Sequence, residues 1–314
     1  MHDCTSALST WAAGLVSAQW ASLVDFKKVF HRYGIPMTEF RIHGFSREDL
    51  LAMDVGPLRS ILHERTHHTI EVSLYRVLNG KLKKPDNYGA QAKFVLGVWR
   101  ERGLPMDTPD LKWCIRYVEI ADGLNTGKEV KLDETLPEPF TSGEMETVEK
   151  LLYGRRSIRQ FTSKPVSEDI VRRVLYAGLM APQGCNVDAR RFIVLRKPEE
   201  WKLVQSDISV DCGVMILVCE DMRSYQVLGF DKRAPQNYYF DVACAADHIC
   251  LMAHALGLGA VWLTHGEETQ RRIREHFGLP ENFYTRCHIV MGWPDEAPIK
   301  SLRMSLDDAL IGEP

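Results

Sequence analysis

Residues 155–161 read RRSIRQF and form the most informative stretch of the chain. In an extended conformation, side chains alternate, so Arg155, Ser157 and Arg159 share one face while Ile158 turns toward a core. Arginine donates in a fixed fork that matches a phosphate, and serine adds a neutral donor. The stretch therefore predicts an anion-binding edge. Taken alone, it allows a solvated basic segment equally well.

Helices and apolar strands alternate on the C-terminal side of this stretch. A helix is expected to begin after Ser167, which can cap it, and to end before Pro182. Further apolar runs predict strands at 192–195, 214–219, 260–263 and 287–291, and a long helix at 241–256. This alternation is typical of an α/β or α+β sheet domain.

The N-terminal side has a different character. Residues 11–122 carry apolar side chains at helical spacing, interrupted by Gly and Pro, which predicts helices. Residues 124–143 interleave Gly and Pro with acidic and hydroxyl side chains, as linkers do. We therefore expect a helical N-terminal domain at 1–123, a linker at 124–143 and a sheet domain at 144–314.

Composition excludes several classes of protein. The formal net charge of −3 leaves no surplus of cations for a nucleic-acid backbone. The charge-free run Thr5 to Val24 contains Ser, Thr and Gln, so we interpret it as an amphipathic helix and expect no membrane partner. The eight cysteines form no C-x-x-C pair, which favours buried thiols in a reducing cytoplasm over a metal centre.

The histidines do not predict a metal site either. His63, His67 and His68 lie close in sequence, but no further ligand completes a site, so we expect solvated or capping side chains. His248 and His254 are six residues apart and fall on different faces of their helix. No metal is predicted.

Several motifs follow the arginine stretch in a fixed order. They are APQGCN at 181–186, RFIV at 191–194, GLGAVW at 257–262, FGLP at 277–280 and MGWP at 291–294. In this order, over about residues 145–311, the chain resembles the nitroreductase family. Several motifs that agree in order are a stronger signal than any one of them.

The resemblance implies an α+β, nitroreductase-like fold that binds FMN, with a central, mostly antiparallel sheet flanked by helices. Here an all-α N-terminal domain precedes it. The resemblance also implies a homodimer with FMN at the interface between subunits. By position, Arg155 and Ser157 resemble phosphate ligands, with Arg156 between them in the same cofactor site, and Lys300 and Arg303 resemble late phosphate ligands.

The ring of the flavin is matched to other positions. Arg159 resembles the cation beside flavin N1 and the C2 carbonyl, and Asn186 resembles the asparagine that bonds the pyrimidine edge. The backbone at His265 and Gly266 resembles the segment whose amide meets flavin N5. A guanidinium at Arg159 would stabilise the reduced state and raise the flavin potential.

The chain departs from the family after Asn186. Many members read Asn-x-Gln-Pro-Trp, whereas residues 186–190 here read NVDAR. Our favoured interpretation is that Asp188 and Arg190 pair with each other; otherwise they reshape the flavin or substrate edge. Cys185 lacks a placed base, so we expect a packing role.

The function that follows is an FMN-dependent oxidoreductase. Hydride would pass from NAD(P)H through FMN to a small organic acceptor such as a nitroaromatic, a quinone or an enone, by a ping-pong mechanism. This exchange requires no side-chain acid or base, so no catalytic side chain is assigned. The alternative is a flavin-binding sensor, or a subunit reduced by a protein electron donor rather than by NAD(P)H.

Overall fold

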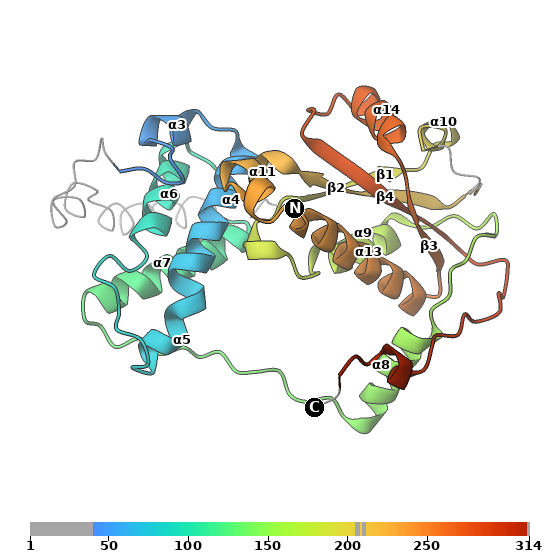
Figure 1. Ribbon diagram of the computed structural model, residues 1–314, viewed down its shortest axis with the longest axis horizontal. Coiled ribbons are helices and arrows are strands. Elements are labelled where there is room, and N and C mark those ends of the chain that lie inside the picture. Colours follow the sequence, from blue (N-terminus) through green and yellow to red (C-terminus); the bar gives the residue numbers. More distant parts are fainter. Residues whose placement is uncertain (1–39, 205–207, 209–211, 313–314) are drawn as a thin grey trace, which may run out of the picture. The chain divides into compact units, whose positions relative to one another are not determined.

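The computed structural model describes residues 40–204, 208 and 212–312 (Figure 1). The helix expected at Thr5 to Val24 lies outside these residues. The chain divides into two compact units, which meet in sequence between Val130 and Lys131. That point falls within residues 124–143. The domain limits at 123 and 144 stay a prediction.

The described part of the first unit is built of helices. They are α3 (Arg47–Ala52), α4 (Val55–Thr66), the π-helix η1 (His67–Glu71), α5 (Val72–Leu78), α6 (Ala90–Glu101) and α7 (Pro109–Asn125). Helix α4 packs against α6 and α7. Leu58, Ile61 and Leu62 of α4 and Val95 and Trp99 of α6 are fully or almost fully buried, as their helical spacing predicts.

The histidine interpretation was partly wrong. His63 is buried rather than solvated, and its Nε2 lies 2.9 Å from a carboxylate oxygen of Asp110. A buried imidazole needs such a partner, because an unsatisfied polar atom in the core is costly. His67 and His68 keep partly exposed rings.

The second unit holds the sheet. Its elements are α8 (Ser142–Gly154), α9 (Glu168–Leu179), the short helix η2 (Gly184–Asn186), β1 (Arg190–Leu195), α10 (Pro198–Trp201), β2 (Val214–Asp221), α11 (Met222–Val227), α12 (Phe230–Arg233), α13 (Asn237–Ala255), β3 (Gly259–Thr264), α14 (Glu267–Phe277), β4 (Phe283–Gly292) and α15 (Leu306–Ala309). The strand order is β1-β2-β4-β3, and every neighbouring pair is antiparallel. The antiparallel α+β sheet is confirmed.

Helices cover both faces of this sheet (Figure 1). On one face, α9 and α13 pack over Ile216 of β2 and Ile289 of β4. On the other, Ile273 of α14 packs over Leu217 and Val290. Strand β2 is buried along its whole length, which explains why its sequence is a continuous apolar run rather than an alternating one.

Helices α9 and α13 approach closely at one glycine. A Cβ on Gly178 would lie 2.8 Å from Cγ1 of Ile249, so only hydrogen fits between the helices there.

Among the described residues, no helix combines the length and the apolar composition needed to cross a bilayer.

Candidate functional site

The arginine stretch docks at the start of β3. Ser157 forms a parallel bridge with Ala260, and the N–H of Ile158 donates to the Ala260 carbonyl at 3.2 Å. Ile158 is buried, as the alternation predicts. Arg155 is half-buried and Arg159 is exposed, so the charged side chains remain on the accessible side of this edge.

Two glycines explain why the stretch lies so close to the sheet. Gly259 of β3 and Gly292 of β4 are cross-strand partners. A Cβ on Gly259 would lie 2.6 Å from Cβ and Cγ2 of Ile158, and one on Gly292 would lie 2.9 Å from Cδ1 of Phe161. The missing side chains therefore form the slot that receives Ile158 and Phe161. The motifs around 257–262 and 291–294 need glycine for this reason.

The segment after β4 closes the other side of the stretch. The N–H of Thr162 donates to the Trp293 carbonyl at 2.8 Å, and a carboxylate oxygen of Glu296 accepts from the N–H groups of Arg159 and Gln160. The Arg156 guanidinium donates to the Pro298 carbonyl at 2.9 Å. Chain from far along the sequence thus reaches the arginines.

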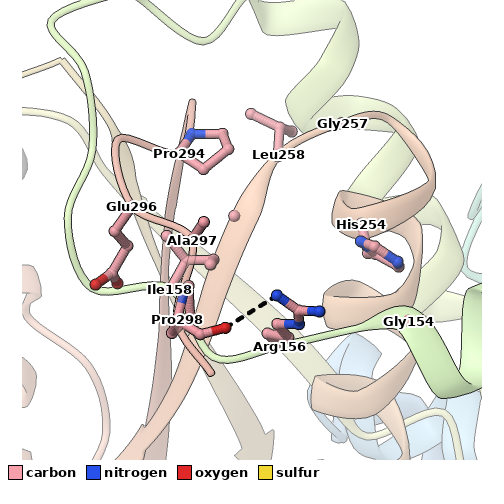
Figure 2. Close-up of a pocket in the computed structure, with 11 residues that line it drawn as sticks. Gly154, Arg156, Ile158, His254, Gly257, Leu258, Pro294, Glu296, Ala297 and Pro298 are labelled. Atoms are coloured by element: carbon pink, nitrogen blue, oxygen red, sulfur yellow. Dashed lines mark hydrogen bonds between the residues drawn. The ribbon is translucent and has the colours of Figure 1, made fainter. Parts of the chain in front are cut away.

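A pocket of about 380 Å³ opens between these segments (Figure 2). The stretch supplies Arg156 and Ile158, the end of α13 supplies His254, and the last segment supplies Glu296 and Pro298. Figure 2 shows the Arg156 guanidinium and the His254 ring bordering the same space. The Arg156 guanidinium therefore places a positive charge on this side of the pocket.

His254 reports the local charge. Burial lowers its pKa, and the positive charges of Arg155 and Lys150 lower it further. Two cations close enough to disfavour a protonated imidazole would favour an anion at the same place. Lys300 follows Pro298 by two residues, and both Lys300 and Arg303 are exposed.

Asn186 lies at a different place, in the short helix η2. The loop that contains it is tied to the first turns of α13, because Asp241 Oδ1 accepts from the Gly184 N–H at 2.8 Å. The Asn186 side-chain oxygen accepts from Gln183 at 3.2 Å. Arg155, by contrast, acts electrostatically on Cys250 and His254 near the other end of α13.

His265 and Gly266 follow the last residue of β3, and Gly266 precedes the first turn of α14 in an extended conformation. The His265 ring bonds inward, with Nε2 at 3.0 Å from the Thr285 carbonyl and Nδ1 at 3.1 Å from Nδ1 of His288. Burial lowers the pKa of each ring to about 4. Both imidazoles are therefore neutral at pH 7.

The predicted residues thus fall into two groups, one at the start of β3 and the end of α13, the other at the opposite ends of these two elements. Arg155, Arg156 and Ser157 gather at the start of β3 and the end of α13. His265 and Gly266 lie at the far end of β3, about 16 Å away at the rise of a strand. Asn186 lies near Asp241, about 20 Å along α13 from His254. A ligand that touches both groups must be elongated, with an anionic end at the arginines.

Comparison with known proteins identifies the family. The profile of the Nitroreductase family matches residues 152–209 and 197–293. A protein of Archaeoglobus fulgidus named "Putative NADH dehydrogenase/NAD(P)H nitroreductase" is 30% identical over 159 residues, which make up 48% of this chain and 88% of that protein. The chain belongs to the nitroreductase family.

Other nitroreductase-family relatives are more distant. The NADPH-flavin oxidoreductase of Vibrio harveyi is 25% identical over 162 residues, covering 48% of this chain and 67% of that one. A solved structure of an FMN-dependent nitroreductase from Clostridium difficile is 25% identical with a TM-score of 0.43, and the match covers 52% of this chain and 96% of that one. The family profile begins at residue 152, so it does not extend to the helical unit.

The pairing that we favoured between Asp188 and Arg190, where the chain departs from the family pattern, is wrong. The amino groups of Arg190 do not donate to Asp188. They donate to four backbone carbonyls, those of Gly178, Ala181, Pro182 and Asp241. Arg190 is 2% exposed, and at that depth unpaired carbonyls compete successfully for a guanidinium.

Sequence reasoning also missed residues of the site. His254 was considered only as a metal ligand, and Glu296 was not considered at all. Glu296 contacts Arg159 across 137 positions of sequence, so no local pattern reveals it. For Asp241, the signal in the sequence was weak: a carboxylate at the start of the largely apolar helix expected at 241–256.

Proposed function

We propose that this chain is an FMN-dependent oxidoreductase that passes hydride from NAD(P)H to a small organic acceptor. The observation that carries the proposal is the docking of three arginines at one end of β3, beside this pocket and at the opposite end from His265 and Gly266. Membership of the nitroreductase family supports it, as do relatives named for flavin and NADPH.

The side chains at the start of β3 fit a phosphate group. The Arg156 guanidinium and the His254 ring border the pocket, and Gly257 and Gly259 open its wall. The carboxylate of Glu296 already accepts from two backbone N–H groups, so it does not compete fully for the guanidinium. Arginine and backbone donors are the usual ligands of a phosphate monoester.

We assign the remaining contacts to FMN by the position of each residue in the family pattern. Arg155, Arg156, Ser157, Lys300 and Arg303 hold the phosphate. Arg159 places positive charge beside N1 and the C2 carbonyl, the Gly266 region offers its backbone amide toward N5, and Asn186 bonds the pyrimidine edge. When bound, FMN supplies the hydride chemistry. The chain supplies orientation and a fixed electrostatic field.

We further propose a homodimer with FMN at the interface. Large apolar side chains are exposed on the sheet unit, at Tyr176 of α9, at Met180 directly after α9, and at Tyr239 and Phe240 of α13. Clustered exposed apolar residues mark interaction sites in soluble proteins. A second copy of this chain would cover them.

The reaction proposed is ping-pong. NAD(P)H and the acceptor, which is a nitroaromatic, a quinone or an enone, use the same cleft in turn. No ionised side chain is needed to move a proton, and the neutral His265 and His288 rings fit that expectation. Seven described cysteines are free thiols, which supports a reducing cytoplasm as the compartment.

The test is spectroscopic. The purified protein should carry FMN, and anaerobic NADPH or NADH should bleach its visible absorption, after which a quinone should restore it. Arg155→Met combined with Arg159→Gln should lower the FMN content of the protein, whereas Arg76→Gln, a change at an exposed residue of α5, should leave it unchanged. A colourless protein that rejects added FMN would refute the proposal. Bound FMN that neither nicotinamide reduces would instead favour a sensor or a protein electron donor.

A further inference from the structure

A buried charged cluster lies behind the loop that carries Asn186. It consists of Arg190 at the start of β1, Glu220 near the end of β2, Tyr225 of α11 and Asp241 of α13. All four are at most 4% exposed. Buried charges are expensive unless they are paired and hydrogen-bonded, so this cluster needs a physical explanation.

Arg190 ties three segments together. One amino group donates to the carbonyls of Gly178 at 2.8 Å and Ala181 at 3.2 Å, where α9 ends. The other donates to Pro182 at 3.1 Å, where the loop begins, and to the Asp241 carbonyl of α13 at 3.0 Å. A single planar guanidinium thus fixes the loop entrance relative to both helices.

Asp241 secures the next residue of the loop. Its Oδ1 accepts from the Gly184 N–H, and its Oδ2 accepts from the Tyr225 hydroxyl. Burial raises the pKa of Glu220 well above its usual range, with Asp241 adding to the rise. Neither carboxylate oxygen of Glu220 has a hydrogen-bond partner among the described residues. Oε1 of Glu220 lies 4.0 Å from Nε of Arg190, so these two side chains form an ion pair inside the cluster.

The loop held in this way is strained. Cys185, Asn186 and Asp188 have φ values of 53°, 52° and 53°, in the left-handed region that side chains other than glycine rarely adopt. Gln183 braces the loop from within, since its Oε1 accepts from the Asp188 N–H at 3.1 Å and its Nε2 donates to Asn186 Oδ1. Such a conformation persists only where the surroundings over-determine it.

We propose that Arg190 is a positioning residue, which with Asp241 holds the loop 183–188 in the strained conformation that presents Asn186 to the flavin ring. This inference rests on the proposed function. It explains the departure at residue 190, because the guanidinium sits in the core and bonds the backbone behind the loop rather than the ligand. The cluster therefore governs the ring end of the cofactor site and not the phosphate end.

Arg190→Lys tests this assignment, because it keeps the charge but one ammonium group cannot bond four carbonyls. We expect the variant to bind FMN and riboflavin at least tenfold more weakly than the natural chain, by the same factor for both, since the loss is at the ring. Arg155→Gln should weaken FMN binding more than riboflavin binding. Arg196→Lys is the matched control: Arg196 follows β1 and donates to Val166 and Glu168, away from the loop, so binding should not change.

A rescue separates positioning from general stability. Cys185→Gly, added to Arg190→Lys, should recover most of the riboflavin affinity, because glycine adopts the left-handed conformation without strain. If Arg190→Lys does not fold, Tyr225→Phe removes one bond to Asp241 and should give a smaller loss that Cys185→Gly also reverses. Unchanged riboflavin binding in a folded Arg190→Lys or Tyr225→Phe chain, or no recovery with glycine, overturns the inference. Failure of the natural chain to bind either flavin refutes the proposed function itself.

Discussion

The slot at Gly259 provides the sharpest test of how the arginine stretch is held. An added Cβ would lie 2.6 Å from Cβ and Cγ2 of Ile158 and 2.8 Å from its Cγ1, whereas carbon atoms settle at about 3.5 to 4.0 Å. Ile158 would therefore have to retreat by about 1 Å. Rotation of its side chain does not relieve the clash, because Cβ is fixed to the backbone.

The magnitude follows from what the retreat breaks. Overpacking of this kind costs about 1 to 3 kcal/mol. The hydrogen bond from Ile158 to Ala260, already 3.2 Å long, would be lost with it. If the stretch lifts from the sheet, FMN must dock it again on binding, and 1 to 3 kcal/mol corresponds to roughly 5- to 150-fold weaker affinity.

Quenching of FMN fluorescence on titration with apoprotein measures this affinity, and a urea curve measures stability. Gly259→Ala should weaken FMN binding within that range. Gly143→Ala is the control, because a Cβ there meets nothing within 4 Å. Ile158→Ala removes two of the three clashing atoms. The loss of FMN affinity in the double variant should therefore be smaller than the sum of the losses in the two single variants. Natural affinity in Gly259→Ala, or strictly additive losses, would refute the slot argument.

Three further predictions concern single residues. Burial raises the pKa of Glu64, yet hydrogen bonds from His43, Arg65 and His68 bring it down from 4.5 to about 2. Its carboxylate therefore stabilises the fold above pH 4.5 by up to about 3 kcal/mol, and this is lost as the pH falls toward 2. Glu64→Gln should remove that pH dependence from urea curves, while Glu48→Gln, at an exposed residue, should keep it. Leu58→Ala, in a fully buried position, should cost about 2 to 5 kcal/mol in the same assay, and a smaller loss would contradict the core assigned to α4. Arg159→Gln should lower the midpoint potential of bound FMN by roughly 30 mV or more, measured against a reference dye, since a cation beside N1 favours the reduced form; an unchanged potential would move Arg159 away from the ring.

Local pattern was enough to predict the elements of the sheet unit. The apolar runs at 214–219 and 287–291 became β2 and β4, and the helix after Ser167 became α9, because burial selects side chains at the spacing of each element. The order of the glycine and arginine motifs was enough to indicate the family. These are properties that neighbouring residues determine together, so one sequence contains them.

The contacts between groups far apart in the sequence depend on the tertiary structure. Arg156 reaches Pro298 across 142 positions, and Arg190 bonds Asp241 across 51. The sequence placed Asp188 beside Arg190 and favoured a pair, but burial made the nearby carbonyls the better partners. A guanidinium in the core bonds whatever acceptors the packing leaves unsatisfied, and packing depends on the whole chain rather than on the residues beside it.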